Sequence, residues 1–302
     1  MGGYLTQIDG IKVGHYTDKA ALTGCTAVLC EGGAVAGVDV RGCAPGTRET
    51  DLLRGYNIVE RVNAIMLCGG SAYGLDAASG AMQFLEKKGI GVPMPGGVVP
   101  IVPAAVIFDL GIGDFSVRPG KQEGYAACAA ARSGGFETGS VGAGTGATVA
   151  KLYGPQYANM GGIGTCCIEL SGGVKVGALA VVNALGEIYD PDTGKLVMGA
   201  SINGRALTNE EKMQAVFAAM GNTTIGVVAT NAILTREEAN KLASIAHDGL
   251  AMAIRPVHTP YDGDTFFGLS TMQLAGVPFA TILTAAVRVV TDAILSAVGI
   301  DK

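Results

Sequence analysis

The most informative segment of this sequence is Gly221-Asn222-Thr223-Thr224-Ile225-Gly226-Val227-Val228-Ala229-Thr230. From Thr223 onward the composition is β-branched and apolar, which predicts a strand over residues 223–230. Upstream, Thr208-Asn209-Glu210-Glu211 has the pattern of a helix start, and apolar residues at helical spacing predict a helix over residues 209–220. The bond between Asn222 and Thr223 therefore joins a predicted helix to a predicted strand.

The position of Thr223 is compatible with two interpretations. An ordinary helix-to-strand loop also places Asn at the end of a helix and Thr at the start of a strand. If the Asn222–Thr223 bond breaks, however, Thr223 gains a free α-amine with a reference pKa of about 7.7 to 8.0, which suits a general base near neutral pH. The same residue would then supply both nucleophile and base. The local pattern alone leaves both interpretations open.

Composition excludes several classes of protein. Of the 302 residues, 49% are hydrophobic and 16% charged, yet we find no uninterrupted apolar run of the length that a membrane span needs. The net charge is −5 and the basic residues are scattered, which argues against nucleic-acid binding. No repeat or low-complexity linker divides the chain, so we expect one domain over residues 1–302. The start has no secretory pattern, which favours a cytoplasmic location.

The cysteines and histidines do not form a metal-binding pattern. Seven cysteines, without a Cys-x-x-Cys pair and with mostly apolar neighbours, are typical of reduced core residues. The three histidines lie at no recognisable ligand spacing. We therefore expect neither a structural metal nor a cofactor.

Hydrophobic periodicity predicts a mixture of strands and long helices. Strands are expected over residues 26–30, 64–67, 175–182, 223–230 and 266–270, and helices over residues 75–88, 122–132, 209–220, 236–254 and 279–298. Their order does not alternate strictly, so a layered α/β or α+β domain is the conservative prediction.

A glycine-rich loop has two interpretations. Gly142-Ala143-Gly144-Thr145-Gly146-Ala147 satisfies the dinucleotide-binding pattern, but a convincing preceding strand and a βαβ unit are missing, so we disfavour that interpretation. Such a loop can instead bring backbone N–H groups to an oxyanion or a substrate, which makes Gly144 and Thr145 candidates. A serine triad built on Ser71 is a weak alternative, because Tyr73 replaces the second glycine of the nucleophile elbow.

Four polar residues are candidates for catalysis. Asp262 and Asp264 point to the same side if the segment is extended, where they can orient an amine, although a solvated turn also explains them. Lys151 is either a surface lysine or a cation near an oxyanion. Asn183 ends an apolar strand and could present an amide donor or act as a turn cap.

Together these segments resemble the self-processing DmpA/NylC hydrolases. The resemblance spans nearly the whole chain, through G-C-T-A-V at Gly24, C-G-G-S-A-Y-G-L at Cys68, G-A-G-T-G-A-T at Gly142, A-V-V-N at Ala180, G-N-T-T-I-G-V-V-A-T-N-A at Gly221 and D-G-D-T-F-F at Asp262. Within that family, the NylC branch has threonine after asparagine, whereas the DmpA branch has serine after glycine. Asn222-Thr223 therefore resembles the NylC branch.

The resemblance implies an αββα sandwich of the ornithine acetyltransferase type, similar to N-terminal-nucleophile hydrolases. It also implies cleavage of the Asn222–Thr223 bond into an α piece, residues 1–222, and a β piece, residues 223–302, that assemble as a homo-oligomer, such as a tetramer of αβ units. Thr223 would then be the nucleophile. Asp262 and Asp264 would hold its amine, and Asn183 and Lys151 would polarise the scissile carbonyl.

Three functions remain open at this stage. The first is an amidohydrolase for small peptides or ω-amino-acid oligomers, of the aminopeptidase or 6-aminohexanoate-oligomer hydrolase type. The second is an acyltransferase on the same scaffold, and the third is a metabolite-binding protein that never processes. Fold kinship alone does not decide among them.

Overall fold

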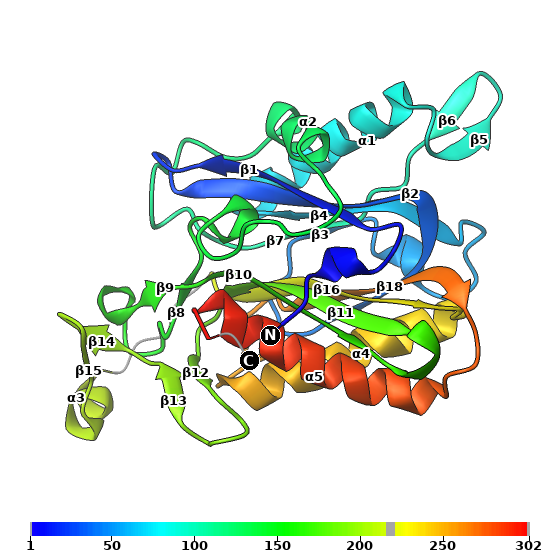
Figure 1. The fold of residues 1–302 in the computed structure, drawn as a ribbon. Coiled ribbons are helices and arrows are strands. Elements are labelled where there is room, and N and C mark those ends of the chain that lie inside the picture. The colour runs from blue at the N-terminus through cyan, green and yellow to red at the C-terminus, as the bar shows by residue number, and fades with distance from the viewer. Residues whose placement is uncertain (1, 216–220, 301–302) are drawn as a thin grey trace.

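A nine-stranded sheet forms the centre of the computed structural model, which describes residues 2–215 and 221–300 (Figure 1). Its strands follow the order β10-β11-β16-β18-β2-β4-β7-β3, and β1 pairs with β2. They are β1 (Lys12–Asp18), β2 (Thr23–Val40), β3 (Thr47–Arg48), β4 (Arg61–Cys68), β7 (Ala104–Val106), β10 (Gly162–Glu169), β11 (Lys175–Asn183), β16 (Thr223–Ala232) and β18 (Thr265–Leu274).

The long strand β2 divides this sheet into two layers. Its first part, residues 23–29, pairs with β1 and β4, and its last part, residues 35–40, pairs with β18. The pairing with β4 is irregular between Leu29 and Ala34. One layer therefore contains β1, β4, β7 and β3, the other contains β10, β11, β16 and β18, and β2 belongs to both.

Helices cover the outer face of each layer (Figure 1). Helices α1 (Ala77–Lys87) and α2 (Lys121–Ala129) lie over β1, β2 and β4, whereas α4 (Arg236–Ala253) and α5 (Phe279–Ala297) lie over β10, β11, β18 and β2. One apolar core fills the space between the sheet layers. A second core lies between one layer and helices α4 and α5, and a third lies between the other layer and helices α1 and α2. The predicted αββα sandwich is confirmed.

Strand β16 is buried along its whole length in the middle of the second layer. Ile225, Val227 and Ala229 belong to the core between the layers, while Val228 belongs to the core beneath α4 and α5. The alternation follows from the two-residue period of a strand with both faces covered. All five predicted strands lie within observed strands.

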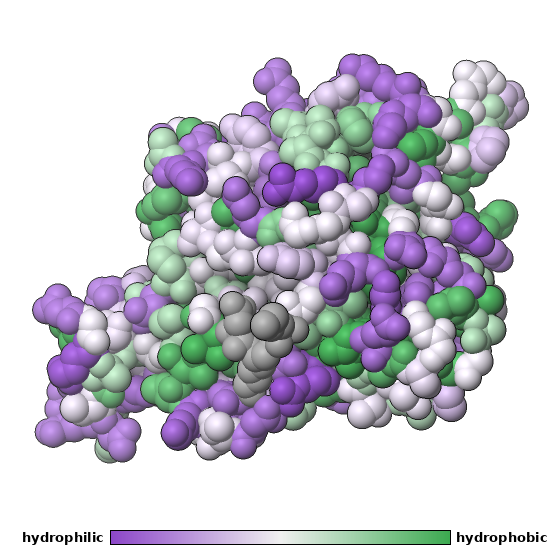
Figure 2. Space-filling view, viewed as in Figure 1, coloured by the Kyte–Doolittle hydropathy of each residue, from purple (hydrophilic) through white to green (hydrophobic). Residues whose placement is uncertain are grey.

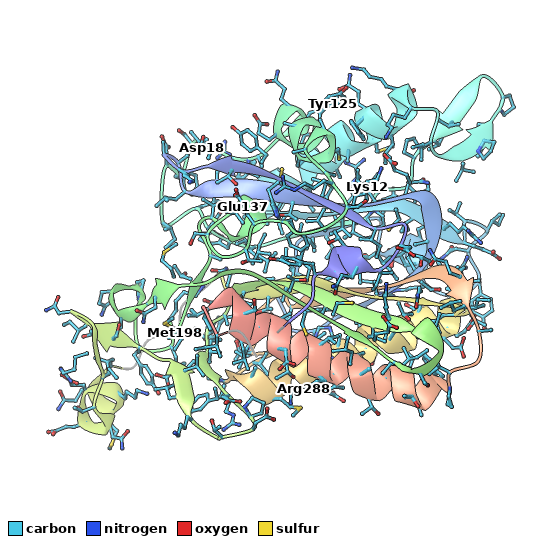
Figure 3. The ribbon with its side chains drawn as sticks, in the orientation of Figure 1. Lys12, Asp18, Tyr125, Glu137, Met198 and Arg288 are labelled. Carbon is cyan, nitrogen blue, oxygen red and sulfur yellow. The ribbon has the colours of Figure 1, made fainter. Side chains whose placement is uncertain are left out.

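Helix α5 is the one helix among the described residues that is long and apolar enough to cross a membrane, by length and composition only. Half of that window is buried, and α5 packs on β10 and β11. Arg288 points outward from it (Figure 3) and pairs with Asp192 and Asp292. Helix α5 therefore packs as an amphipathic helix on the outer face of its sheet layer.

The chain between β11 and β16 forms a lobe at the side of the sandwich (Figure 1). It contains β12 (Glu187–Tyr189), β13 (Leu196–Met198), β14 (Ser201–Ile202), β15 (Arg205–Ala206) and α3 (Asn209–Gln214), and β12 also pairs with β17 (Ile254–Arg255). Hydrophilic residues cover much of its surface (Figure 2). Thr208 caps α3 as its sequence predicts, whereas residues 216–220 of the expected helix lie outside the described residues.

Short elements complete the fold. Two hairpins are formed by β5 (Val92–Met94) with β6 (Gly97–Val99), and by β8 (Thr148–Val149) with β9 (Asn159–Met160). All seven cysteines are free, and six of them are buried as expected for core residues, but Cys43 is exposed.

Candidate active site

Antiparallel pairing of β11 with β16 places Asn183 directly opposite Thr223. Asn183 is the last residue of β11 and Thr223 is the first of β16, and the lobe connects the two strands. Both side chains are buried, with Thr223 5% exposed and Asn183 fully enclosed. The sheet therefore brings together two residues that are 40 positions apart in the chain.

The Thr223 hydroxyl lies against the peptide bond that precedes it. Its Oγ1–H donates to the carbonyl oxygen of Asn222, which also accepts a hydrogen bond of 3.2 Å from the Gly263 N–H. The Asn222 N–H donates to the Tyr261 carbonyl at 3.3 Å. Asn222 is thus held as a short extension of β16, beside residues 261–263.

The parallel register of β16 and β18 explains why the two aspartates lie here. Ile225 is opposite Thr265, and the same offset places Asn222 in a bridge with Asp262. Two residues further along, the Thr224 N–H donates to Asp264 Oδ1 at 2.6 Å. The Asp-x-Asp segment therefore runs beside the first residues of β16, and the predicted role of both aspartates in holding the Thr223 amine stays a prediction.

The two carboxylates differ in their partners. Asp262 Oδ2 accepts from the Thr259 N–H at 2.7 Å and from the Thr259 hydroxyl at 2.6 Å. Burial, followed by the negative charge of Asp264, raises the pKa of Asp262. Asp264 instead accepts from Thr224 and from His258, whose Nδ1 lies 2.7 Å from Oδ2.

Lys151 is a buried amine and not a surface lysine. Its Nζ donates to Asn183 Oδ1 at 2.7 Å and to the Asn183 carbonyl at 3.1 Å. Burial lowers the pKa of Lys151 to about 7, and the negative charge of Asp262 opposes that shift. An amine that titrates near neutral pH beside a polar cluster is a strong functional signal.

Asn183 links Lys151 to the segment before the nucleophile. Its Oδ1 accepts from Lys151 and from the Thr148 N–H at 3.0 Å, so its Nδ2 is the donor side of the amide. That Nδ2 donates to the Phe108 carbonyl at 3.2 Å and to the Gly221 carbonyl at 3.5 Å. The Asn183 amide is thus directed at the carbonyl of Gly221, the residue that precedes Asn222.

The glycine-rich loop is a short turn that packs against β1, β2 and β10. The Gly144 N–H donates to the Val141 carbonyl at 2.8 Å, and the Thr145 N–H donates to the Gly142 carbonyl at 3.2 Å. Both N–H groups are therefore engaged inside the turn, and their contribution to an oxyanion site stays a prediction. The turn does not lead into a helix, which disfavours a dinucleotide site.

Sequence reasoning missed His258. The sequence pattern assigns it no role, although it lies four residues before Asp262. The signal that could have found it is the run His258-Thr259-Pro260-Tyr261-Asp262-Gly263-Asp264, in which a turn folds back on the acidic pair.

Comparison with known proteins agrees with this geometry. Residues 4–300 match the family model for Peptidase family S58. An uncharacterized aminopeptidase of Mycobacterium tuberculosis is 46% identical over 297 residues, covering 92% of this chain and 84% of that protein. A 6-aminohexanoate-oligomer endohydrolase of a Kocuria species is 32% identical over 277 residues, covering 88% and 74%.

Solved structures show the same fold. A Burkholderia β-aminopeptidase matches with a TM-score of 0.72 and 20% identity, covering 98% of this chain and 87% of that chain. An L-aminopeptidase D-Ala-esterase/amidase from Ochrobactrum anthropi, described as a variant of the Ntn hydrolase fold, matches with a TM-score of 0.73 and 19% identity, covering 98% and 86%. The sequence matches and the shared fold lead to one conclusion: the chain belongs to peptidase family S58 and is a hydrolase of peptide or related amide bonds.

Proposed function

We propose that this hydrolase is made by self-cleavage of the Asn222–Thr223 bond and that Thr223 is its N-terminal nucleophile. The observation that carries the proposal is the contact of the Thr223 hydroxyl with the Asn222 carbonyl, in a buried site lined by Asn183 and Asp264. A hydroxyl held against its own preceding carbonyl needs little rearrangement to attack it.

Self-cleavage proceeds through an ester. Thr223 Oγ1 attacks the carbonyl carbon of Asn222, the C–N bond breaks, and the hydroxyl proton passes to the departing nitrogen. Water then hydrolyses the ester, which leaves a carboxylate on Asn222 and a free amine and hydroxyl on Thr223. During the attack, the Gly263 N–H that already binds the Asn222 oxygen can stabilise its developing negative charge.

The mature site works by the same chemistry on a separate substrate. The Thr223 amine accepts the proton of the Thr223 hydroxyl, which attacks the substrate amide, and the amine then protonates the leaving group. In this proposal Asp264, which is bonded to the neighbouring Thr224 N–H, and Asp262, which is paired with Asn222, orient that amine. Asn183 Nδ2 is released once residues 221–222 withdraw, and with Lys151 behind it can donate to the oxyanion.

The substrate class follows from the relatives and from the site. Relatives are named as an aminopeptidase and as a 6-aminohexanoate-oligomer endohydrolase. The cluster of two carboxylates beside the nucleophile favours substrates that carry an amine. We therefore propose hydrolysis of amide bonds in small peptides or ω-amino-acid oligomers by a cytoplasmic homo-oligomer of αβ units.

Intact mass under denaturing conditions, with N-terminal sequencing, tests the proposal. Cleavage at Asn222–Thr223 gives pieces of about 22 and 8 kDa, scaled from 30.5 kDa by residue count, and the small piece begins Thr-Thr-Ile. Thr223→Ala should leave one intact chain without hydrolytic activity. Thr223→Ser, which keeps the hydroxyl, is the matched control and should still process. Two pieces from Thr223→Ala, cut at the same bond, would show that another group is the nucleophile.

A further inference from the structure

His258 lies beside Asp264 in the candidate active site but has no part in the chemistry described above. Its Nδ1 is 2.7 Å from Asp264 Oδ2, and its backbone N–H is 3.3 Å from the same oxygen. A carboxylate only accepts hydrogen bonds, so the ring nitrogen is the donor. The other oxygen of Asp264 accepts from Thr224 N–H at 2.6 Å. Asp264 thus accepts hydrogen bonds from both His258 and Thr224, the residue after the nucleophile.

The backbone of His258 has a left-handed conformation. His258 has φ of +54°, in the left-handed region that residues other than glycine seldom adopt, although asparagine, aspartate and histidine do so several-fold more often than the rest. The strain persists only where surrounding structure over-determines it, and such positions gather at functional sites. Here the unusual backbone conformation directs both the N–H and the ring Nδ1 of one residue to one carboxylate oxygen.

A second histidine supports the ring from behind. His247 of α4 meets the His258 ring edge to face, with centroids 4.8 Å apart, and its Nε2 lies 3.1 Å from the Asp39 carbonyl. Burial lowers the pKa of His247 to about 4, so it is neutral near pH 7 and adds no competing charge. The Nε2 of His258 is buried and without a hydrogen-bond partner among the described residues, which leaves Nδ1 as the polar anchor of the ring.

We propose that His258 is a positioning residue of the active site: its Nδ1–H fixes the Asp264 carboxylate in the orientation that holds the start of β16 and the Thr223 amine. This inference rests on the proposed function of Thr223. A purely structural turn would need only the backbone N–H of residue 258, which any residue supplies. The ring adds a donor that bears on the catalytic carboxylate itself.

Variants at this position can separate the donor from the backbone strain. Asparagine places its Nδ2 near the position of the histidine Nδ1, and it tolerates positive φ. Glycine is free of the strain but lacks the donor. Aspartate has the size of asparagine and also tolerates positive φ, but it accepts rather than donates. His258→Asn should therefore behave like the wild type, and His258→Gly and His258→Asp should not.

The first measurement is the rate of self-processing of the full chain after cell-free synthesis, which needs no substrate. His258→Gly and His258→Asp should process about 10-fold to 100-fold more slowly, the range for a hydrogen bond to a charged group. His258→Asn should stay within about threefold of the wild type. Folding is checked by thermal unfolding of each substitution in the Thr223→Ala chain, where processing cannot alter the comparison.

The second measurement uses the processed enzymes with an alanine p-nitroanilide and a 6-aminohexanoate trimer. Loss of the donor should lower kcat by a similar factor and leave KM nearly unchanged.

The outcomes distinguish this inference from the proposed function. Wild-type processing rates and kcat in both His258→Gly and His258→Asp would overturn the role of His258 while leaving Thr223 in place. Equal losses in His258→Asn and His258→Gly would also overturn it, because the donor would then be irrelevant. Cleavage of the bond after Asn222 in the Thr223→Ala chain would instead refute the proposed function.

Discussion

Lys151 shows how a single residue can link the chemistry of the site to the stability of the fold. Its amine is buried behind Asn183, which accepts both of its hydrogen bonds to described residues, and burial lowers its pKa from 10.5 to about 7. The folded state therefore releases this proton at a lower pH than the unfolded state does. Between these two values the unfolded chain binds more protons, so the free energy of unfolding contributed by Lys151 rises with pH.

This sign leads to a prediction at the residue scale. In the Thr223→Ala chain, replacing Lys151 with methionine removes a rise in stability between about pH 7 and pH 10, of roughly 1.4 kcal/mol per pKa unit. Urea unfolding at several pH values measures it, as the difference between the two chains. Subtraction removes the contribution of the buried cysteines, such as Cys30, whose raised pKa gives the opposite slope. A difference that does not vary with pH would show that Lys151 stays charged when folded.

Residue patterns mark Thr223, Asp262 and Asp264 as candidates, and the structure brings them together, but their hydrogen-bond partners cannot be predicted from the sequence. Thr223, Asp262 and Asp264 stood out because a strand start and an Asp-x-Asp pair are visible in the sequence. The surroundings of Asp264 were not visible, since His258 reaches it only through a turn with positive φ. Sequence spacing carries no information on such a backbone conformation unless glycine marks it.

At the scale of elements, the sequence predicted strands and helices better than their pairing. Residues 26–30 were predicted as a short strand, whereas β2 runs on through Glu31-Gly32-Gly33 to Val40 and joins both layers. A charge and two glycines interrupt the apolar pattern that defines a strand from sequence. The long lobe between Asn183 and Thr223 likewise conceals that β11 and β16 are neighbours.

The abundance of glycine has an explanation at this scale, and Gly164 of β10 allows a test of it. A Cβ at Gly164 would collide with the backbone of α5 at Ala293 and Ala297, so the helix can lie this close only on a glycine. Because backbone cannot yield as a side chain can, Gly164→Ala should cost about 1–3 kcal/mol of stability. Gly97→Ala in β6 is the control, since a Cβ there meets nothing within 4 Å. Urea unfolding of both variants in the Thr223→Ala chain gives the comparison, and equal stabilities would refute close packing of α5.

At the scale of the whole molecule, self-cleavage would cut a chain whose two parts share the two largest cores, while the core beneath α1 and α2 belongs to the first part alone. The piece from residue 223 onward would contribute β16, α4, β18 and α5, and β16 and β18 lie between β11 and β2 of the other piece. Ile225 packs in the same core as Val28, and Val289 in the same core as Val176. Breaking one peptide bond removes none of this burial, which is the main favourable term in folding.

The two pieces should therefore remain together after processing and separate only when the fold is lost. Native size-exclusion chromatography of the processed protein should give one peak that contains both pieces in equal amounts, at the elution volume of the Thr223→Ala chain. Unfolding of the processed protein releases two chains instead of one, so its urea midpoint should rise more steeply with protein concentration than that of Thr223→Ala. Elution of the small piece on its own under native conditions would mean that the shared cores are not what holds the molecule together.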